Sequence, residues 1–163
     1  MDKLSKILVI VGVILVGVVT NYSIFQKESL IKNGKEIYLK LAPVDPRSLM
    51  QGDYMALRFA ISRDIYEAVK NQKSSQGLAV LELNSQNIAK FKSIYQNQPL
   101  NSNEVLIKYR KNRHRIKLST DSYFFEEGSA KKFEKAEYGV FRVNPKTGEA
   151  ILTNLADIYL KKI

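Results

Sequence analysis

The segment that determines the fold runs from Val44 to Phe59 and reads Val-Asp-Pro-Arg-Ser-Leu-Met-Gln-Gly-Asp-Tyr-Met-Ala-Leu-Arg-Phe. Its middle has the composition of a tight turn. Gly52 permits a backbone φ that other residues avoid, so a turn can end there. Asp53 can accept backbone hydrogen bonds within that turn. The segment therefore predicts a loop that leads directly into a strand over residues 54–60.

The predicted strand has two different faces, because successive side chains of a strand point to opposite sides of the sheet. The apolar face, which we expect in the core, consists of Met55, Leu57 and Phe59. The other face consists of Tyr54, Ala56 and Arg58. The charged residues of the loop and strand are close in sequence and can form a network: Asp45, Arg47, Asp53 and Arg58. This network is most simply a set of salt bridges that fixes the loop, and the alternative is a ligand or partner site.

Short elements with turns between them fill the rest of the chain. Apolar and polar residues alternate over 36–41, 78–83, 88–94, 105–110, 115–119, 138–143 and 150–155, and residues 121–126 are aromatic-rich and extended. Short helices are predicted over 62–70, with Ser62 as the N-cap, and over 129–136. About eight strands at this spacing predict a mainly β (α+β) fold, in which a transmembrane helix precedes a small antiparallel β barrel or sandwich with short helices.

An apolar run precedes this domain. The stretch from Ile7 to Phe25 has 19 residues, close to the ~20 that a membrane-spanning helix needs. A cleaved signal peptide has an apolar region of similar length, but no small-x-small cleavage site follows the run. We therefore predict an uncleaved anchor over residues 1–25, a helical stalk over 26–35 and a β domain over 36–163.

Basic residues flank the apolar run on both sides. Lys3 and Lys6 precede it, which favours a cytoplasmic N-terminus and places the β domain outside the cytoplasm. The asymmetry is weakened by the basic residues that follow the run, which are Lys27, Lys32 and Lys35.

Composition limits the chemistry. The chain has 163 residues, no cysteine and a formal net charge of +10. Disulfides, thiolate metal sites and a cysteine nucleophile are therefore excluded, and we expect no cofactor. The positive charge favours anionic neighbours, either phospholipid headgroups or nucleic acid, although a simple lysine-rich surface explains it as well.

The most basic part of the surface is the predicted hairpin around residues 111–114. Alternation places Lys108, Arg110, Arg115 and Lys117 on its outer face. The apolar residues between them explain this hairpin as an amphipathic sheet without any ligand. As a functional site it suits anionic lipid headgroups. Nucleic acid is not expected, because no series of aromatic residues interleaves the charges.

Catalytic arrangements are weak in this sequence. An anchor followed by Ser48 has a superficial likeness to Ser/Lys proteases, but nothing places Lys70 as its base. His114, the one histidine, falls in a hairpin turn, where we expect a solvated residue without a metal. Asp121, Glu126 and Glu127 form an acidic cluster, but adjacent residues of an extended strand point in opposite directions. We therefore expect no enzyme, with a Ser/Lys-type hydrolase as the minor alternative.

The chain resembles the GDYXXLXY family of bacterial membrane-anchored envelope proteins. The resemblance rests on the Gly52-Asp53-Tyr54 motif and its approach, on residues 121–128, on residues 138–143 and on the N-terminal anchor. The chain departs from the family motif at Phe59, because the motif has tyrosine at that position. No role of the tyrosine hydroxyl can therefore be assigned to this chain.

The resemblance implies a location and a kind of partner. Family members are typically small envelope proteins, often found with polytopic membrane proteins. We therefore expect a single-pass protein of the bacterial inner membrane, with an extracytoplasmic domain that acts as an accessory module for a polytopic membrane protein. The motif residues Asp45, Arg47, Gly52, Asp53, Tyr54, Leu57, Arg58 and Phe59 would shape the contact surface. The alternative is a ligand-binding or hydrolytic domain with a pocket where Asp53, Arg58 and Glu126 converge.

Overall fold

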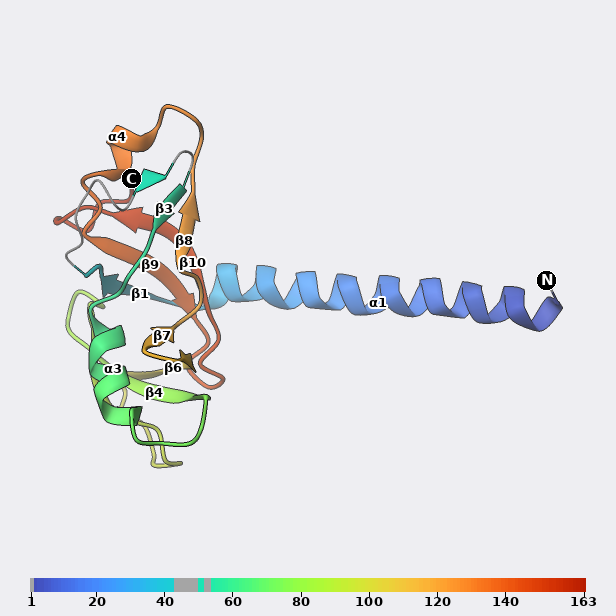
Figure 1. Cartoon of the computed structure of the whole chain (residues 1–163), viewed down its shortest axis with the longest axis horizontal. Coiled ribbons are helices and arrows are strands. Elements are labelled where there is room, and N and C mark those ends of the chain that lie inside the picture. The colour runs from blue at the N-terminus through green and yellow to red at the C-terminus, as the bar shows by residue number, and fades with distance from the viewer. Residues whose placement is uncertain (1, 43–49, 52–53) are drawn as a thin grey trace.

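The computed structural model describes residues 2–42, 50–51 and 54–163. One long helix projects from a domain built of short strands (Figure 1). The helices are α1 (Lys3–Asn33), α3 (Ile61–Val69) and α4 (Ala130–Phe133). The strands are β1 (Lys35–Lys40), β2 (Met50–Gln51), β3 (Tyr54–Ala56), β4 (Gln76–Leu83), β5 (Ala89–Ile94), β6 (Glu104–Asn112), β7 (Arg115–Lys117), β8 (Ser122–Phe124), β9 (Tyr138–Val143) and β10 (Ala150–Ala156).

Helix α1 is long and apolar enough over Ile7–Asn33 to cross a membrane, a test that an N-terminal signal sequence also passes. Its 31 residues span about 46 Å at 1.5 Å per residue. Three polar residues follow the apolar run without interrupting the helix. The side chains of Thr20, Asn21 and Ser23 each donate a hydrogen bond to the carbonyl four residues earlier. The helix therefore continues beyond the apolar run and ends at Asn33.

The domain contains three antiparallel sheets. Their strand orders are β1-β9-β10, β2-β3-β8 and β5-β4-β6-β7. Single bridges join them, from Tyr38 to Ile88 and from Leu41 to Phe59. The predicted α+β class, with antiparallel sheets, few short helices and an N-terminal apolar helix, is confirmed.

One hydrophobic core joins the sheets to α3. Its largest fully buried side chains are Phe141, Ile37, Leu39, Ile65, Leu81, Ile107 and Leu155. The alternating pattern identified core residues correctly, since Met55, Leu57 and Phe59 are each less than 5% exposed. These apolar faces exclude water, and their burial is the main favourable contribution to folding.

The strand predicted over residues 54–60 is shorter than expected. β3 ends at Ala56, and the chain changes partners after Leu57. The Leu57 amide donates to the Asp121 carbonyl, while the Arg58 carbonyl accepts from the Ala42 amide. The segment thus leaves β8 and pairs with the end of β1. Its side chains keep their alternation across this change.

The predicted N-cap of the first short helix is wrong. α3 begins at Ile61, with Ala60 at the N-cap and no capping side chain. Burial of Ile61, Ile65 and Val69 on one face determines where this helix begins and ends. Ser62 therefore lies within its first turn. The C-terminal end is capped instead by Lys111, whose ammonium donates to the Val69 carbonyl at 3.0 Å and also to Gln72.

Candidate functional site

Half of the predicted motif site lies outside the described residues. Those positions are Asp45, Arg47, Gly52 and Asp53. The charge network that we predicted among them therefore stays a prediction. The described motif residues divide into a buried pair, Leu57 and Phe59, and a surface pair, Tyr54 and Arg58.

Phe59 has a structural role that its position in the core explains. Its ring lies edge-on to Phe141, with 5.2 Å between centroids and an interplanar angle of 71°. It also covers Gly139, at which a β-carbon would lie 2.8 Å from the Phe59 Cε1 atom. Phe59, the residue that ends the motif, thus packs against β9. Residues 138–143, which form β9, are also part of the resemblance to the family.

Tyr54 belongs to an aromatic contact at the surface. It pairs with Phe124 across the β3–β8 ladder, with ring centroids 5.7 Å apart. The Phe124 side chain is 74% exposed. Arg58, on the same side of the chain as Tyr54, is also exposed. This part of the motif therefore contributes to an exposed surface.

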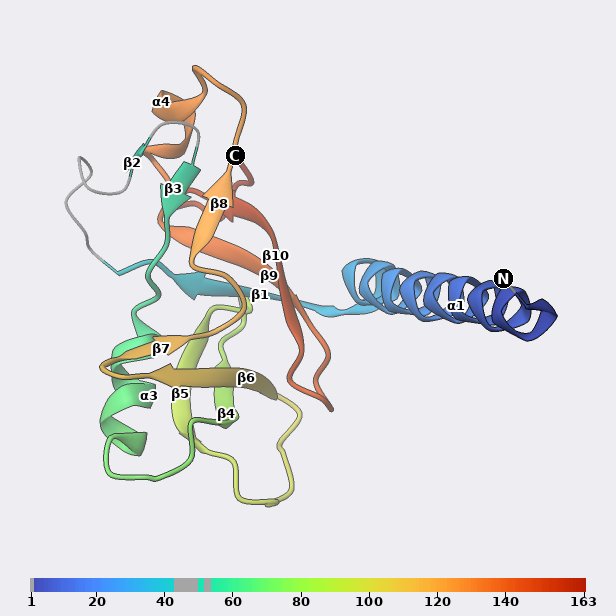
Figure 2. The ribbon, with the colours of Figure 1, turned by 45° about the vertical axis from the view of Figure 1, so that its right-hand side comes forward.

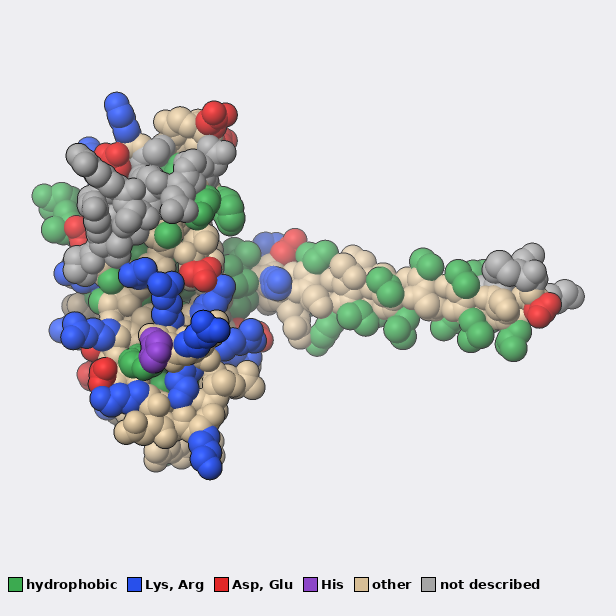
Figure 3. Space-filling model, viewed as in Figure 1, with side chains coloured by type: hydrophobic (Ala, Val, Ile, Leu, Met, Phe, Trp, Pro, Cys, Tyr) green, Lys and Arg blue, Asp and Glu red, His purple; other side chains and the backbone are tan. Residues whose placement is uncertain are grey.

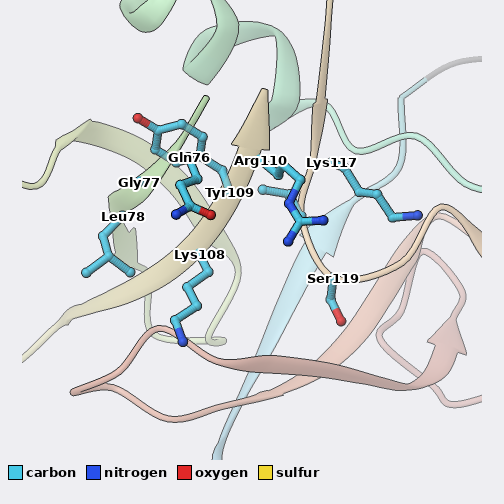
Figure 4. Close-up of a pocket in the computed structure, with 9 residues that line it drawn as sticks. Gln76, Gly77, Leu78, Lys108, Tyr109, Arg110, Lys117 and Ser119 are labelled. Carbon is cyan, nitrogen blue, oxygen red and sulfur yellow. The ribbon is translucent and has the colours of Figure 1, made fainter. Parts of the chain in front are cut away.

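The predicted basic hairpin exists and forms part of a four-stranded sheet. Register places Gln76, Arg110 and Lys117 side by side across β4, β6 and β7. The next row pairs Leu78 with Lys108. Side chains directly opposite one another share a face of the sheet, so the cations gather on one face, as Figure 4 shows around β6.

These side chains line an open depression of about 700 Å³. Lys108, Arg110 and Lys117 provide its charge, and Ser119 and Gln76 provide neutral polar groups. Arg115 lies opposite Asn112 at the turn end of the hairpin and does not line the depression. Figure 3 shows Lys and Arg side chains gathered on the face that carries β6 and β7.

Two of these cations have carboxylate partners. The Lys108 ammonium lies 3.2 Å from Glu149, and that of Lys117 lies 3.0 Å from Asp121. All four side chains are about half exposed, and such pairs contribute little to stability. Among the described residues, no carboxylate lies within ion-pair distance of Arg110.

A second depression, of about 380 Å³, lies where α1 meets the domain. Helix α1 contributes Ser23, Gln26, Lys27 and Leu30 to it. The domain contributes residues 148–151 together with Lys108, Leu118 and Ser119, which also line the first depression. The two depressions therefore adjoin. We call them together the basic groove, with Lys27, Lys108, Arg110 and Lys117 as its cations.

A cluster of polar contacts, which we call the junction clamp, lies where α1 joins the domain. A single residue, Gly34, separates α1 from β1. The Arg142 guanidinium donates to the Gly34 carbonyl at 3.0 Å and pairs with Glu36 at 3.0 Å. Lys162 approaches the same carboxylate at 2.8 Å. Figure 2 shows how β1 leads from α1 straight into the sheet with β9 and β10.

Electrostatics and packing both restrict this junction. The hydrogen bond from Lys162 lowers the pKa of the Glu36 carboxyl, and Tyr38 and Arg142 act in the same direction. The Gly34 amide donates to the Leu30 carbonyl at 2.8 Å. A β-carbon on Gly34 would lie 2.4 Å from that carbonyl oxygen. No larger residue fits here without opening the end of α1.

The remaining candidate residues do not form a common site. His114 lies in the β6–β7 turn, as expected, and contacts the Tyr66 hydroxyl at 3.2 Å. Lys70, the suggested base of a hydrolase, pairs with Glu67 at 2.7 Å, and Ser48 lies outside the described residues. Glu126 and Glu127 are exposed. Within residues 2–42, 50–51 and 54–163, no three His, Asp or Glu side chains are grouped so that they could hold a metal ion.

Sequence reasoning found the groove cations of the hairpin and missed Lys27, Gln76 and Ser119. Their contribution depends on the β4–β6 register and on the contact of α1 with β10, neither of which leaves a local pattern in the sequence. The junction clamp was missed for the same reason, since Glu36 and Lys162 lie far apart in the chain.

Comparison with known proteins identifies the family. No curated protein and no solved structure matches the chain. The family model described as GDYXXLXY protein matches residues 16–155, which is more than half of the chain. The match begins within α1 and ends within β10, so it includes the stalk, the motif strand and the basic hairpin. This chain therefore belongs to the GDYXXLXY family.

Proposed function

We propose that this protein is a single-pass envelope protein whose β domain is a non-enzymatic accessory module for a polytopic membrane protein. The observation that carries the proposal is the clamped junction between α1 and the domain. No flexible linker separates the helix from the domain, because Gly34 alone lies between α1 and β1, its amide donates to Leu30 of α1 and its carbonyl accepts from Arg142 of β9. Such a direct connection suits contact with another protein in the same membrane.

The length of α1 supports a position close to the membrane. If residues 7–25 cross the bilayer, residues 26–33 extend α1 by only about 12 Å beyond the hydrocarbon. The apolar side chains of α1 are exposed along its length, as a helix in lipid requires. Lys3 and Lys6 at its start favour a cytoplasmic N-terminus and hence an extracytoplasmic domain.

The described part of the motif supports a surface role more than a pocket. Its apolar residues are buried in the core, and its surface residues include the Tyr54–Phe124 aromatic contact. Aromatic residues are enriched where proteins bind one another. Arg58 and Glu126, which the alternative pocket requires, are both exposed.

A crosslinking experiment tests the proposal. Full-length protein would be captured from its native membrane after mild crosslinking and gentle solubilisation. We expect a polytopic membrane protein to be captured with the wild type and lost with Phe124→Ala and Asp53→Ala. Asp64→Ala is the matched control, because Asp64 is an exposed carboxylate on α3. Replacement of residues 7–25 by an unrelated apolar sequence of equal length separates anchor contacts from domain contacts.

Two results would refute the accessory role. One is the absence of any membrane partner with the wild-type chain under these conditions. The other is undiminished capture by both Phe124→Ala and Asp53→Ala when circular dichroism shows that the variants are folded. Either result would favour the alternative of a ligand-binding or hydrolytic domain.

A further inference from the structure

We propose that the basic groove binds the phosphate-bearing headgroups of anionic phospholipids in the membrane that α1 crosses. The inference rests on the anchoring part of the proposed function and is independent of any protein partner. It identifies a lipid site that includes residues of the helix and of the sheet.

The position of the groove is the first argument. Its α1 residues, Ser23, Gln26, Lys27 and Leu30, lie on either side of Phe25, where the apolar segment ends. In a spanning helix this boundary coincides with the headgroup region, which extends about 5–8 Å beyond the hydrocarbon on each side. The groove therefore opens at the depth of lipid phosphates.

The charge of the groove is the second argument. The groove has four cations, of which Lys108 pairs with Glu149 and Lys117 pairs with Asp121. The Lys108 and Lys117 pairs are exposed, so a phosphate can replace either carboxylate at small cost. The guanidinium of Arg110 has a planar set of donors that matches phosphate oxygens. Ser119 and Gln26 add neutral polar groups.

The shape of the groove distinguishes lipid from nucleic acid. Binding of single-stranded nucleic acid requires exposed aromatic rings on which bases stack. Tyr109 is the aromatic residue among those lining the groove, and it is only 4% exposed. An open depression beside a membrane helix instead suits a headgroup whose acyl chains remain in the bilayer.

The absence of cysteine allows a direct test on the full-length chain. A Lys146→Cys substitution would place one fluorophore on the exposed turn between β9 and β10, next to the groove residues Gly148 and Glu149. The labelled chain would be reconstituted into phosphatidylcholine nanodiscs. Two samples would be prepared, one with a trace of labelled phosphatidylglycerol and one with a trace of labelled phosphatidylcholine. Both lipids would carry the same nitroxide quencher near the glycerol end of one acyl chain. The ratio of quenching by the two lipids reports local enrichment of the anionic lipid.

We expect labelled phosphatidylglycerol to quench the fluorophore at least about fivefold more efficiently than labelled phosphatidylcholine. A ratio of about fivefold is the preference that one cation near the surface gives. The variant Lys108→Gln/Arg110→Gln/Lys117→Gln should lower the ratio severalfold, because Lys27 is then the one groove cation that remains. The control Lys73→Gln/Lys131→Gln/Lys135→Gln removes the same net charge from exposed positions outside the groove and should keep the wild-type ratio. If the triple groove variant fails to fold, Arg110→Gln alone should still lower the ratio severalfold.

Four results would overturn the inference. A wild-type ratio of one would show no lipid preference. Equal loss in both triple variants would show that net charge alone attracts the lipid. Loss of the preference on addition of millimolar glycerol phosphate would identify a site for free phosphate. Elution of the chain apart from the nanodiscs would refute the anchor as well. The first three results leave the accessory role unaffected, since it is tested by capture of a partner.

Discussion

The packing of Phe59 against β9 makes Gly139→Ala a sensitive test of the core. The new β-carbon would lie 2.8 Å from Phe59 Cε1, 3.0 Å from Phe141 Cε2 and 3.2 Å from Leu152 Cδ1. Ordinary carbon contacts are about 3.5–4.0 Å, so both rings must move. Phe141 is fully buried and Phe59 is 4% exposed, which leaves them little space. Overpacking of this kind costs about 1–3 kcal/mol.

The expected net effect is smaller, because Gly→Ala also restricts the unfolded chain and stabilises by about 0.4–1 kcal/mol. We therefore expect Gly139→Ala to lower the free energy of unfolding by about 1–2 kcal/mol. Thermal unfolding of the full-length chain in detergent, followed by β-sheet circular dichroism, measures this as a decrease of about 3–10 °C in Tm.

The control is Gly17→Ala, at which a β-carbon meets no atom within 4 Å and which should leave the Tm of the domain unchanged. Gly139→Ala should lower the free energy of unfolding by less in a Phe59→Leu background than in the wild type, because the smaller side chain relieves the closest contact. A Gly139→Ala chain as stable as the wild type would refute the packing argument.

Three further predictions concern the junction and the anchor. Gly34→Ala should open the last turn of α1, since its β-carbon would lie 2.4 Å from the Leu30 carbonyl oxygen, and faster amide exchange and proteolysis at residues 30–35 would detect this. The pKa of Glu36 is lowered in the folded state, so its stabilising contribution is complete above the unfolded pKa of about 4.3 and is lost as the pH falls through the folded pKa. In urea unfolding between pH 3 and 7, the free energy of unfolding should therefore fall less steeply with acid in Glu36→Gln than in the wild type. One alanine inserted between Leu15 and Val16 should abolish partner capture but keep the lipid preference, as measured by the two assays above.

Local patterns were sufficient for most of the fold. The strands of the hairpins β4–β5, β6–β7 and β9–β10 coincide with alternating segments of the sequence, because alternation is a local pattern. The turn at residues 144–148 is an example. The Asn144 side chain accepts hydrogen bonds from the Lys146 and Thr147 amides, and Gly148 has a φ of +70°. These are the turn properties that the sequence Asn-Pro-Lys-Thr-Gly predicts.

Features that depend on distant pairing were not predictable in this way. Nothing local in residues 54–60 indicates that the chain leaves β8 at Leu57 to pair with β1. Similarly, Glu36 and Lys162 meet only because the C-terminal segment folds back onto the β1-β9-β10 sheet, where Lys162 bridges to Ala156 of β10. The groove combines both problems, since it requires the register of three strands and the seat of α1 on β10. Its cations could be identified from sequence, but its shape and position could not.

The proposed lipid contact does not depend on the direction in which α1 faces, whereas the proposed contact with a protein partner does. One residue inserted into α1 therefore distinguishes the two contacts. An added residue within a helix rotates everything beyond it by about 100° and advances it by about 1.5 Å. Insertion before Val16 leaves the relation of residues 23–30 to the domain unchanged, because the clamp at Gly34 and Glu36 lies beyond it. In the proposed membrane position lipid would surround the helix on all sides, so the groove would still meet headgroups at nearly the same depth. A protein partner that contacts both the helix and the domain occupies one direction only, so the rotation separates the two parts of its binding surface.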